Sequence, residues 1–174
     1  PYVIVRFSSY LNPWAAENVF GGSYQLTQAL IAFGRGEWLG VGLGNSIQKL
    51  YFLPEAHNDF VLAIIGEELG LVGVATIIIL FCLLVKTAFL IGRNAERKEA
   101  IFEAFIAYGI GLLFAGQAMV NIGVNTGLLP TKGLTLPFLS YGGASLIVSF
   151  FMAALLLRVQ YETECFEFES TSTS

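Results

Sequence analysis

One short stretch, LPEAHNDFVLAIIGEELG at residues 53–70, gathers ionisable side chains at the edge of an apolar segment. It holds the only histidine of the chain, His57, and the only aspartate, Asp59, and it closes with the adjacent Glu67 and Glu68. Ionisable groups close to membrane depth are energetically expensive, so they mark candidate functional sites. A carboxylate at the mouth of a cavity, partly removed from water, has the chemistry of a general base. His57 is predicted to be a hydrogen-bonding partner, not a metal ligand.

A structural role competes with the catalytic one for the same residues. The side chain of Asn58 or Asp59 would accept N–H bonds at the start of the following helix. Glu67 and Glu68 would then lie at the solvated start of that helix, where acidic side chains are favoured.

Because Glu67 and Glu68 are adjacent, we expect them to have different roles. Neighbouring helical positions point about 100° apart, so the two side chains cannot face the same neighbour. One would point into the helix bundle, where it needs a cationic partner, and the other would reach water. Arg35 and Lys132 are the candidate partners.

A second polar group is expected on one helix face, because Gln117, Asn121 and Asn125 recur every fourth residue. We interpret these residues as interhelical hydrogen-bonding groups, which contribute about 0.6 kcal/mol per bond in a membrane. Contact with a substrate is the alternative.

The stretch LLPTKGLTLPFLSYGGAS at residues 128–145 cannot form one continuous helix, because Pro130 and Pro137 interrupt it. Irregular backbone at membrane depth is tolerated where it is buried in protein or lines a wet cavity. Lys132 in such a connection is suited to hold an anion. Ser140 is followed by Tyr-Gly-Gly and so lies outside a G-x-S-x-G pattern, which argues against a serine hydrolase.

Composition indicates an integral membrane protein. Of 174 residues, 55% are hydrophobic and 13% are charged, about half the charged fraction of a soluble domain. The sequence has no basic patch that would suggest a nucleic-acid partner. Two cysteines and one histidine offer no plausible metal cage, so no metal site and no certain cofactor is predicted, and a divalent cation is left open.

Three segments reach the ~20 apolar residues that a bilayer span needs. Within residues 60–160 they run approximately over 69–91, 100–124 and 143–159. Residues 1–59 are expected to form an outer loop with a short interfacial or re-entrant helix at 24–33. The polar tail, 161–174, is expected to be disordered. Because the chain begins with Pro1, we expect it to be a portion of a longer protein.

Positive charge predicts the orientation of the spans. Arg93, Arg97 and Lys98 follow the first span, and Arg158 ends the third. By the positive-inside rule, the first connection and the C-terminal tail are cytoplasmic. Residues 1–59 and the connection at 125–142 are then outside.

The chain resembles the SEDS family of bacterial cell-wall polymerases, and most closely the member that acts in cell division. The resemblance rests on YQLTQALIAFGRGEWLGVGLGNSIQKLYFLPEAHNDF, AIIGEELGLVG and PTKGLTLPFLSYGGASL, in one order between about Asn12 and Glu162. It implies an all-α polytopic membrane protein, a ten-helix bundle of which this chain supplies a large outer loop with short helices and three transmembrane helices. Asn58 stands where Thr is common and Ala144 where Ser is common, and neither change removes an ionisable group.

The resemblance also implies an activity. The family polymerises lipid II, an undecaprenyl-pyrophosphate-linked disaccharide-pentapeptide, into glycan strands, here for septal cell-wall synthesis at the bacterial cytoplasmic (inner) membrane. A class B penicillin-binding protein and other division proteins of the membrane are the expected partners. The essential acid of the family's PExHxDF motif matches Asp59, which we expect to be the general base. The expected pyrophosphate- or sugar-binding residues are Arg35, Lys132, Glu67, Glu68, His57 and Ser140.

Two other functions remain open on the sequence. A lipid II flippase is one, since a broken segment between spans is common in transporters, although a carrier needs ionisable groups at mid-membrane. A scaffold that recruits the penicillin-binding protein without catalysis is the other, and it would make Asp59 dispensable. We expect the 174 residues alone to be inactive, because the cavity would lack most of its walls.

Overall fold

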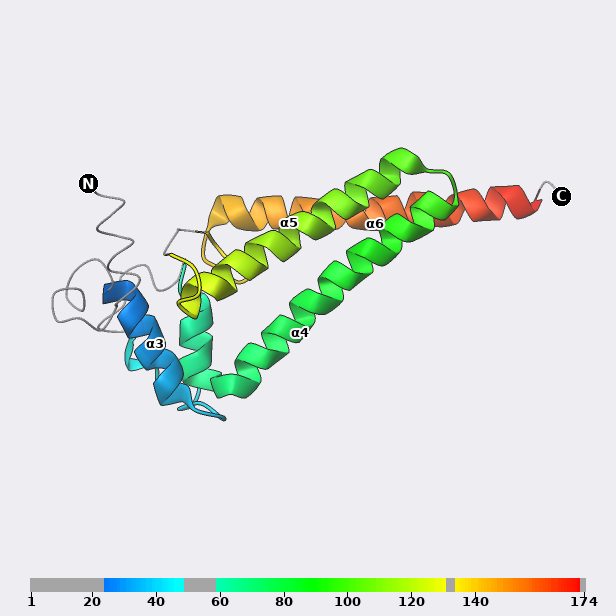
Figure 1. Cartoon of the computed structure of the whole chain (residues 1–174). Coiled ribbons are helices and arrows are strands. Elements are labelled where there is room, and N and C mark those ends of the chain that lie inside the picture. The colour runs from blue at the N-terminus through cyan, green and yellow to red at the C-terminus, as the bar shows by residue number, and fades with distance from the viewer. Residues whose placement is uncertain (1–23, 49–58, 131–133, 173–174) are drawn as a thin grey trace, which may run out of the picture.

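The computed structural model describes residues 24–48, 59–130 and 134–172, and every regular element in these ranges is a helix. Figure 1 shows their arrangement. The elements are α3 (Tyr24–Gly36), α4 (Val61–Arg97), α5 (Ile101–Asn125) and α6 (Gly143–Ser172). The short helix expected at 24–33 is therefore present as α3 and continues for one further turn.

Three of these helices are long and apolar enough to cross a membrane, over Val61–Arg97, Ile101–Asn125 and Gly143–Cys165. The predicted fold class, an all-α polytopic membrane protein, is confirmed. The second helix matches its predicted span within one residue, whereas α4 and α6 extend beyond theirs. Because α4 begins at Val61, Glu67 and Glu68 lie within the helix and not before it.

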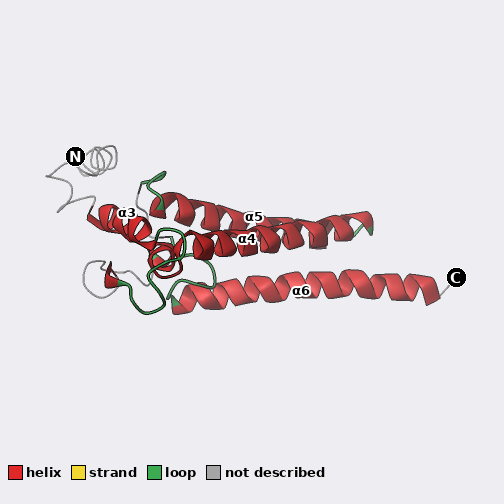
Figure 2. Ribbon diagram, turned by 90° about the horizontal axis from the view of Figure 1, so that it is seen from below, coloured by secondary structure: helices red, strands yellow, loops and turns green. Residues whose placement is uncertain are grey.

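The first two spans form a hairpin closed by a tight turn at residues 98–100. The N–H groups of Lys98 and Glu99 donate to the carbonyls of Ala95 and Glu96, and Glu99 has a φ of 60°. Figure 1 shows α4 and α5 meeting at this turn and moving apart away from it, before the start of α4 returns to the end of α5. In Figure 2, α6 lies on a separate side of the pair.

The helix α4 is broken at Gly70, where φ is 67° and ψ is −163°. Its first piece packs beside α3, and its second piece crosses the molecule at a different angle (Figure 1). A left-handed φ is costly for residues with a Cβ, so glycine is required at this position. A break also frees helical N–H and C=O groups, which must find other partners inside a membrane.

The loop after α3 supplies those partners. The freed carbonyls of Glu67 and Glu68 accept hydrogen bonds from the N–H groups of Val41 (2.9 Å) and Gly42 (3.1 Å). Beyond the break, Leu71 donates to the carbonyl of Glu37 (3.0 Å) and Val72 to that of Trp38 (3.3 Å). We call residues 37–42 the splice loop, because its backbone replaces the two helical bonds that Gly70 removes.

A shared core joins the three long helices. Its buried side chains are Ala88, Ile91, Ala95, Ala104, Ala107, Ile110, Phe114, Met152, Leu156 and Val159. Phe138, in the connection before α6, places its ring 5.4 Å from that of Phe114 and 5.5 Å from that of Phe150. This aromatic contact anchors the connection against α5 and α6.

The C-terminal tail differs from the expectation of disorder from residue 161, because α6 continues to Ser172. Side chains one turn apart support the added turns. Arg158 pairs with Glu162 at 2.6 Å, and Gln160 donates to Glu164 at 3.0 Å. Such i,i+4 pairs stabilise a helix on its solvated face.

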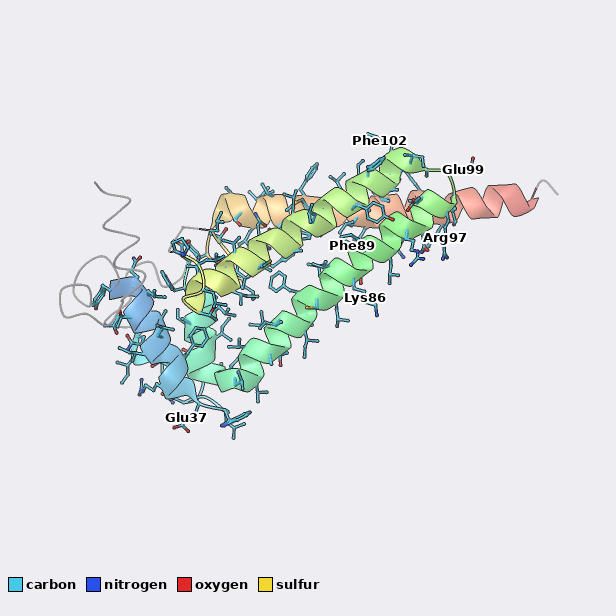
Figure 3. The ribbon with its side chains drawn as sticks, viewed as in Figure 1. Glu37, Lys86, Phe89, Arg97, Glu99 and Phe102 are labelled. Atoms are coloured by element: carbon cyan, nitrogen blue, oxygen red, sulfur yellow. The ribbon has the colours of Figure 1, made fainter. Side chains whose placement is uncertain are left out.

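The charged side chains mark two opposite ends of the hairpin. Figure 3 shows Glu37 beside the break in α4, and Arg97 and Glu99 at the far end of that helix. The end with Glu37 also holds the start of α4, the end of α5 and the start of α6 (Figure 1). We call it the break end.

Candidate functional site

The break end carries the described residues for which chemistry was predicted. Asp59 is half-buried and lies immediately before α4. Arg35 is in the last turn of α3 and Glu67 in the first piece of α4. His57 and Lys132 lie outside the described residues, as does Asn58.

The backbone of Asp59 is held by two buried asparagines from α5. Its carbonyl accepts hydrogen bonds from Nδ2 of Asn121 (3.2 Å) and Nδ2 of Asn125 (2.9 Å). The predicted interhelical hydrogen-bonding role is confirmed for Asn125, whose Oδ1 accepts the N–H of Ala63 in α4, whereas Asn121 bonds to segments outside the helices. Gln117, on the same face of α5, is half-buried.

The start of α4 is capped by a neighbouring helix. Its N-cap residue is Phe60, which makes no side-chain cap bond. The N–H of Ala63, at the third helical position, donates to Oδ1 of Asn125 at 3.2 Å. An N-cap side chain normally accepts this N–H from within the same segment, whereas here a side chain of α5 accepts it.

A buried ion pair joins α3 to α4. Nη1 of Arg35 lies 2.6 Å from Oε1 of Glu67, and the exposed side-chain fractions are 38% and 0%. Arg35 is one of the two partners predicted for Glu67. The interpretation of Glu67 as a residue at a solvated helix start is wrong, because the break at Gly70 and the splice loop place it inside the protein.

Two further donors complete the surroundings of Glu67. Oε2 accepts a hydrogen bond from Oγ of Ser46 at 2.5 Å, and Oε1 accepts one from the N–H of Ile47 at 3.3 Å. Both residues follow the splice loop, and neither was predicted from the sequence. With both oxygens bonded and no exposed surface, Glu67 can hold Arg35 in place but cannot reach a substrate in this arrangement.

Close backbone packing at glycines sets the geometry of the pair. A Cβ on Gly36 would lie 1.8 Å from the carbonyl oxygen of Gly66, and one on Gly40 would lie 2.1 Å from that of Glu68. Glycine at these two positions therefore lets the end of α3 and the splice loop approach the backbone of α4 closely. The approach brings the end of α3 within reach of Glu67.

The remaining two candidate residues differ in their surroundings. Glu68 is half-buried, and its buried Oε1 has no hydrogen-bond partner among the described residues. Ser140 is 1% exposed, and its Oγ accepts a hydrogen bond from the N–H of Leu136 at 2.7 Å. Ser140 therefore stabilises the turn before α6 in this structure.

Together these residues place a half-buried carboxylate and a partly exposed guanidinium at one end of an apolar bundle. The backbone carbonyl of Asp59 is held by two asparagines, and the guanidinium is held by a buried acid. Such a pair of groups can accept a proton and neutralise an anion, the two tasks of general base catalysis and charge stabilisation.

Comparisons with known proteins find both sequence and structural matches to this chain. Residues 1–165 match the sequence model of the FtsW/RodA/SpoVE family, described as a cell cycle protein. A solved structure described as "Structural coordination of polymerization and crosslinking by a peptidoglycan synthase complex" superposes with a TM-score of 0.67 at 27% identity. The superposition covers 94% of this chain and 43% of that one.

Curated relatives named "Probable peptidoglycan glycosyltransferase FtsW" are more similar in sequence. That of Halomonas elongata is 58% identical over 94% of this chain and 41% of its own length. That of Hahella chejuensis is 60% identical over 93% of this chain and 40% of its own length. That of Coxiella burnetii is 56% identical over 94% and 44%. The chain thus spans about two fifths of the length of the curated relatives it matches.

Proposed function

The chain belongs to the FtsW/RodA/SpoVE family of cell cycle proteins, and from this membership we propose that it is part of a peptidoglycan glycosyltransferase. In this proposal the enzyme polymerises lipid II into glycan strands during septal wall synthesis. The observation that carries it is the polar break end, where Asp59 and the Arg35–Glu67 pair meet an apolar bundle. A substrate with a charged head and a membrane-bound tail needs both environments.

The reaction is a displacement at a sugar carbon. Asp59 takes the proton from the 4-hydroxyl of the acceptor lipid II, and that oxygen attacks the anomeric carbon of the growing strand. The bond from this carbon to the phosphate oxygen breaks, and undecaprenyl pyrophosphate leaves with the bonding electrons. A carboxylate is suited to the first step because it can accept the proton of the hydroxyl as that oxygen attacks.

The leaving pyrophosphate carries concentrated negative charge, which a fixed cation would stabilise. Arg35 offers a planar guanidinium that can bond two phosphate oxygens at once. Its exposed fraction of 38% leaves part of the side chain accessible while Nη1 is held by Glu67. We assign it, together with Lys132, to the pyrophosphate. His57 and Glu68 are assigned to the surroundings of the sugar and phosphate groups.

An apolar cavity of about 720 Å³ between α4 and α5 suits the lipid part of such a substrate. Most of its lining is apolar, with Ile78, Phe81 and Val85 from α4 and Ala118, Met119 and Ile122 from α5, and it also includes Cys82 and Lys86 of α4. The cavity extends to Leu128 and Leu129, after the end of α5. A polyprenyl chain would therefore leave the break end sideways between two spans.

The expected setting follows from the same premise. The solved structure similar to this chain is a peptidoglycan synthase complex that couples polymerisation with crosslinking. We propose a class B penicillin-binding protein as the crosslinking partner, and other division proteins of the membrane as further neighbours. The enzyme would lie in the cytoplasmic membrane at the septum, with the break end outside and the end of α6 in the cytoplasm.

The test is polymerisation of labelled lipid II by the full-length protein bound to its penicillin-binding protein. Wild type is compared with Asp59→Asn, and with Glu99→Gln as a control that removes an exposed acid at the opposite end. We expect the Asp59 variant to lose glycan synthesis while it still binds its partner, and the control to keep it. Glycan strands formed at the normal rate by Asp59→Asn would remove Asp59 from the reaction and the proposed mechanism with it.

The same samples separate the two alternative functions. A flippase would move labelled lipid II across vesicles that contain the protein, with or without polymerisation. A scaffold would support division with Asp59→Asn as well as with wild type. Either result, together with intact glycan synthesis by another enzyme, would replace the polymerase proposal.

A further inference from the structure

Two buried amides form the most complete polar network of the described residues. Asn121 is 2% exposed and Asn125 is 0% exposed, and both lie near the end of α5. Burying an amide without partners costs several kcal/mol. The hydrogen bonds of these two amides therefore offset a large cost of burial.

The amide of Asn121 joins two segments that are far apart in the sequence. Its Nδ2 donates to the carbonyl of Asp59 at 3.2 Å and to the carbonyl of Leu134 at 2.7 Å. An NH₂ group has two hydrogens, so both are used. One side chain thus links the segment of the candidate base to the connection that follows Lys132.

Asn125 holds the first segment from a second direction. Its Nδ2 donates to the carbonyl of Asp59 at 2.9 Å and lies 3.2 Å from Oδ1 of Asn121. Its Oδ1 accepts the N–H of Ala63 at 3.2 Å. The amide of Asn125 therefore bonds to Asp59 before α4 and to Ala63 in its first turn, and it also contacts the amide of Asn121.

The connection on the other side of Asn121 also forms hydrogen bonds of its own. The N–H of Leu136 donates to Oγ of Ser140 at 2.7 Å, and Oγ of Thr135 lies 2.9 Å from Oγ of Ser145 at the start of α6. Leu136 itself is 1% exposed. Asn121 consequently links Asp59 to a connection that is itself hydrogen-bonded to the start of α6.

We propose that Asn121 and Asn125 are positioning residues for the glycosyl transfer, which act by fixing the backbone of Asp59 relative to the connection after Lys132. This inference rests on the proposed function. The amides touch carbonyls and not the reacting groups, so their effect passes through the placement of the Asp59 side chain. A displacement of about 1 Å in a reacting group can lower a rate by about 100-fold.

The test uses Asn121→Leu, which replaces the amide by an apolar group of similar size, in the full-length protein with its penicillin-binding protein. The matched control is Ile110→Val, which shortens a buried core side chain on the same helix. None of the hydrogen bonds described above for Asp59 and Leu134 involves Ile110. Lipid II polymerisation is measured as kcat and KM, over a range of pH, and rates are normalised to folded protein.

We expect kcat of Asn121→Leu to fall roughly 10- to 100-fold, with KM within about threefold of wild type, because placement and not binding is lost. The pH profile of kcat should shift, since the surroundings of the base change. Ile110→Val should keep the wild-type profile and a kcat within about twofold. A kcat and pH profile equal to those of the control would overturn the inference.

A second variant and the Asp59→Asn measurement keep the result interpretable. If Asn121→Leu does not fold, Asn121→Ser takes its place, because a small polar side chain leaves room for water. If Asp59→Asn lost activity while the Asn121 variant kept a normal kcat, the positioning role would be refuted and the proposed function would stand. Normal activity in Asp59→Asn would refute the proposed function, and the positioning role would fall with it.

Discussion

The Arg35–Glu67 pair should respond unequally to removal of its two members. Glu67 has no exposed surface, whereas 38% of the Arg35 side chain is exposed. If Glu67 is neutralised, the remaining guanidinium can turn to water. If Arg35 is neutralised, the remaining carboxylate stays buried without a cation.

The structure allows an estimate of both effects. Glu67→Gln keeps an oxygen that can accept from Arg35 and Ile47, and the hydroxyl of Ser46 can rotate to accept from the new amide. Hydrogen bonds to charged groups exceed neutral ones by about 1 kcal/mol each, so we expect a loss of roughly 1–2 kcal/mol. Arg35→Gln leaves an uncompensated buried charge, which typically costs about 3–5 kcal/mol.

The assay is unfolding of the full-length protein in mixed micelles of increasing SDS content, followed for wild type, Glu67→Gln and Arg35→Gln. Glu37→Gln is the control, because it removes an exposed acid two residues from Arg35 and should change stability by less than about 0.5 kcal/mol. Equal losses for the two pair variants, or a larger loss for Glu67→Gln, would show that the difference in burial does not govern the pair.

Three further outcomes follow from the structure. Gly36→Ala should destabilise the protein by several kcal/mol in thermal unfolding, because its Cβ would lie 1.8 Å from a carbonyl oxygen of Gly66. Gly34→Ala, with open space around its Cβ, should stabilise by up to about 1 kcal/mol, and the same sign for both would contradict the packing. Ser140→Ala should lower stability by about 1–3 kcal/mol through the unpaired N–H of Leu136. If the variant kept its stability but lost activity, Ser140 would instead be assigned to substrate binding. The 174 residues alone should make no glycan from labelled lipid II, because relatives are more than twice as long, and any synthesis by them would contradict this.

The three spans were predictable because an apolar run of membrane length is a local property of the sequence. The residues at which the helices begin and end were less predictable. The rule for span length starts the first helix near Leu69, whereas α4 starts at Val61. The helix can begin earlier because the splice loop satisfies the break at Gly70, and that loop lies some 30 residues before it in the chain.

The candidate site was predictable in its ionisable residues and not in its supporting contacts. Arg35 was one of two possible partners of Glu67, since charge alone limits the choice. Ser46 and the N–H of Ile47 carry no distinguishing pattern in the sequence. The same holds for the capping of Ala63 by Asn125, which pairs residues 62 positions apart. Long-range contacts of this kind depend on the packing of α3 and α5 against α4.

The splice loop has a consequence for local opening of the protein. The N–H groups of Val41 and Gly42 are protected only while they meet α4, and those of Leu71 and Val72 only while they meet the loop. Undocking the loop would expose all four amides in one event, together with the carbonyls of Glu67 and Glu68. In hydrogen–deuterium exchange, two segments far apart in the chain should then share one protection factor and behave as a single foldon. Because Glu67 lies within that unit, its ion pair with Arg35 would open and close with the loop.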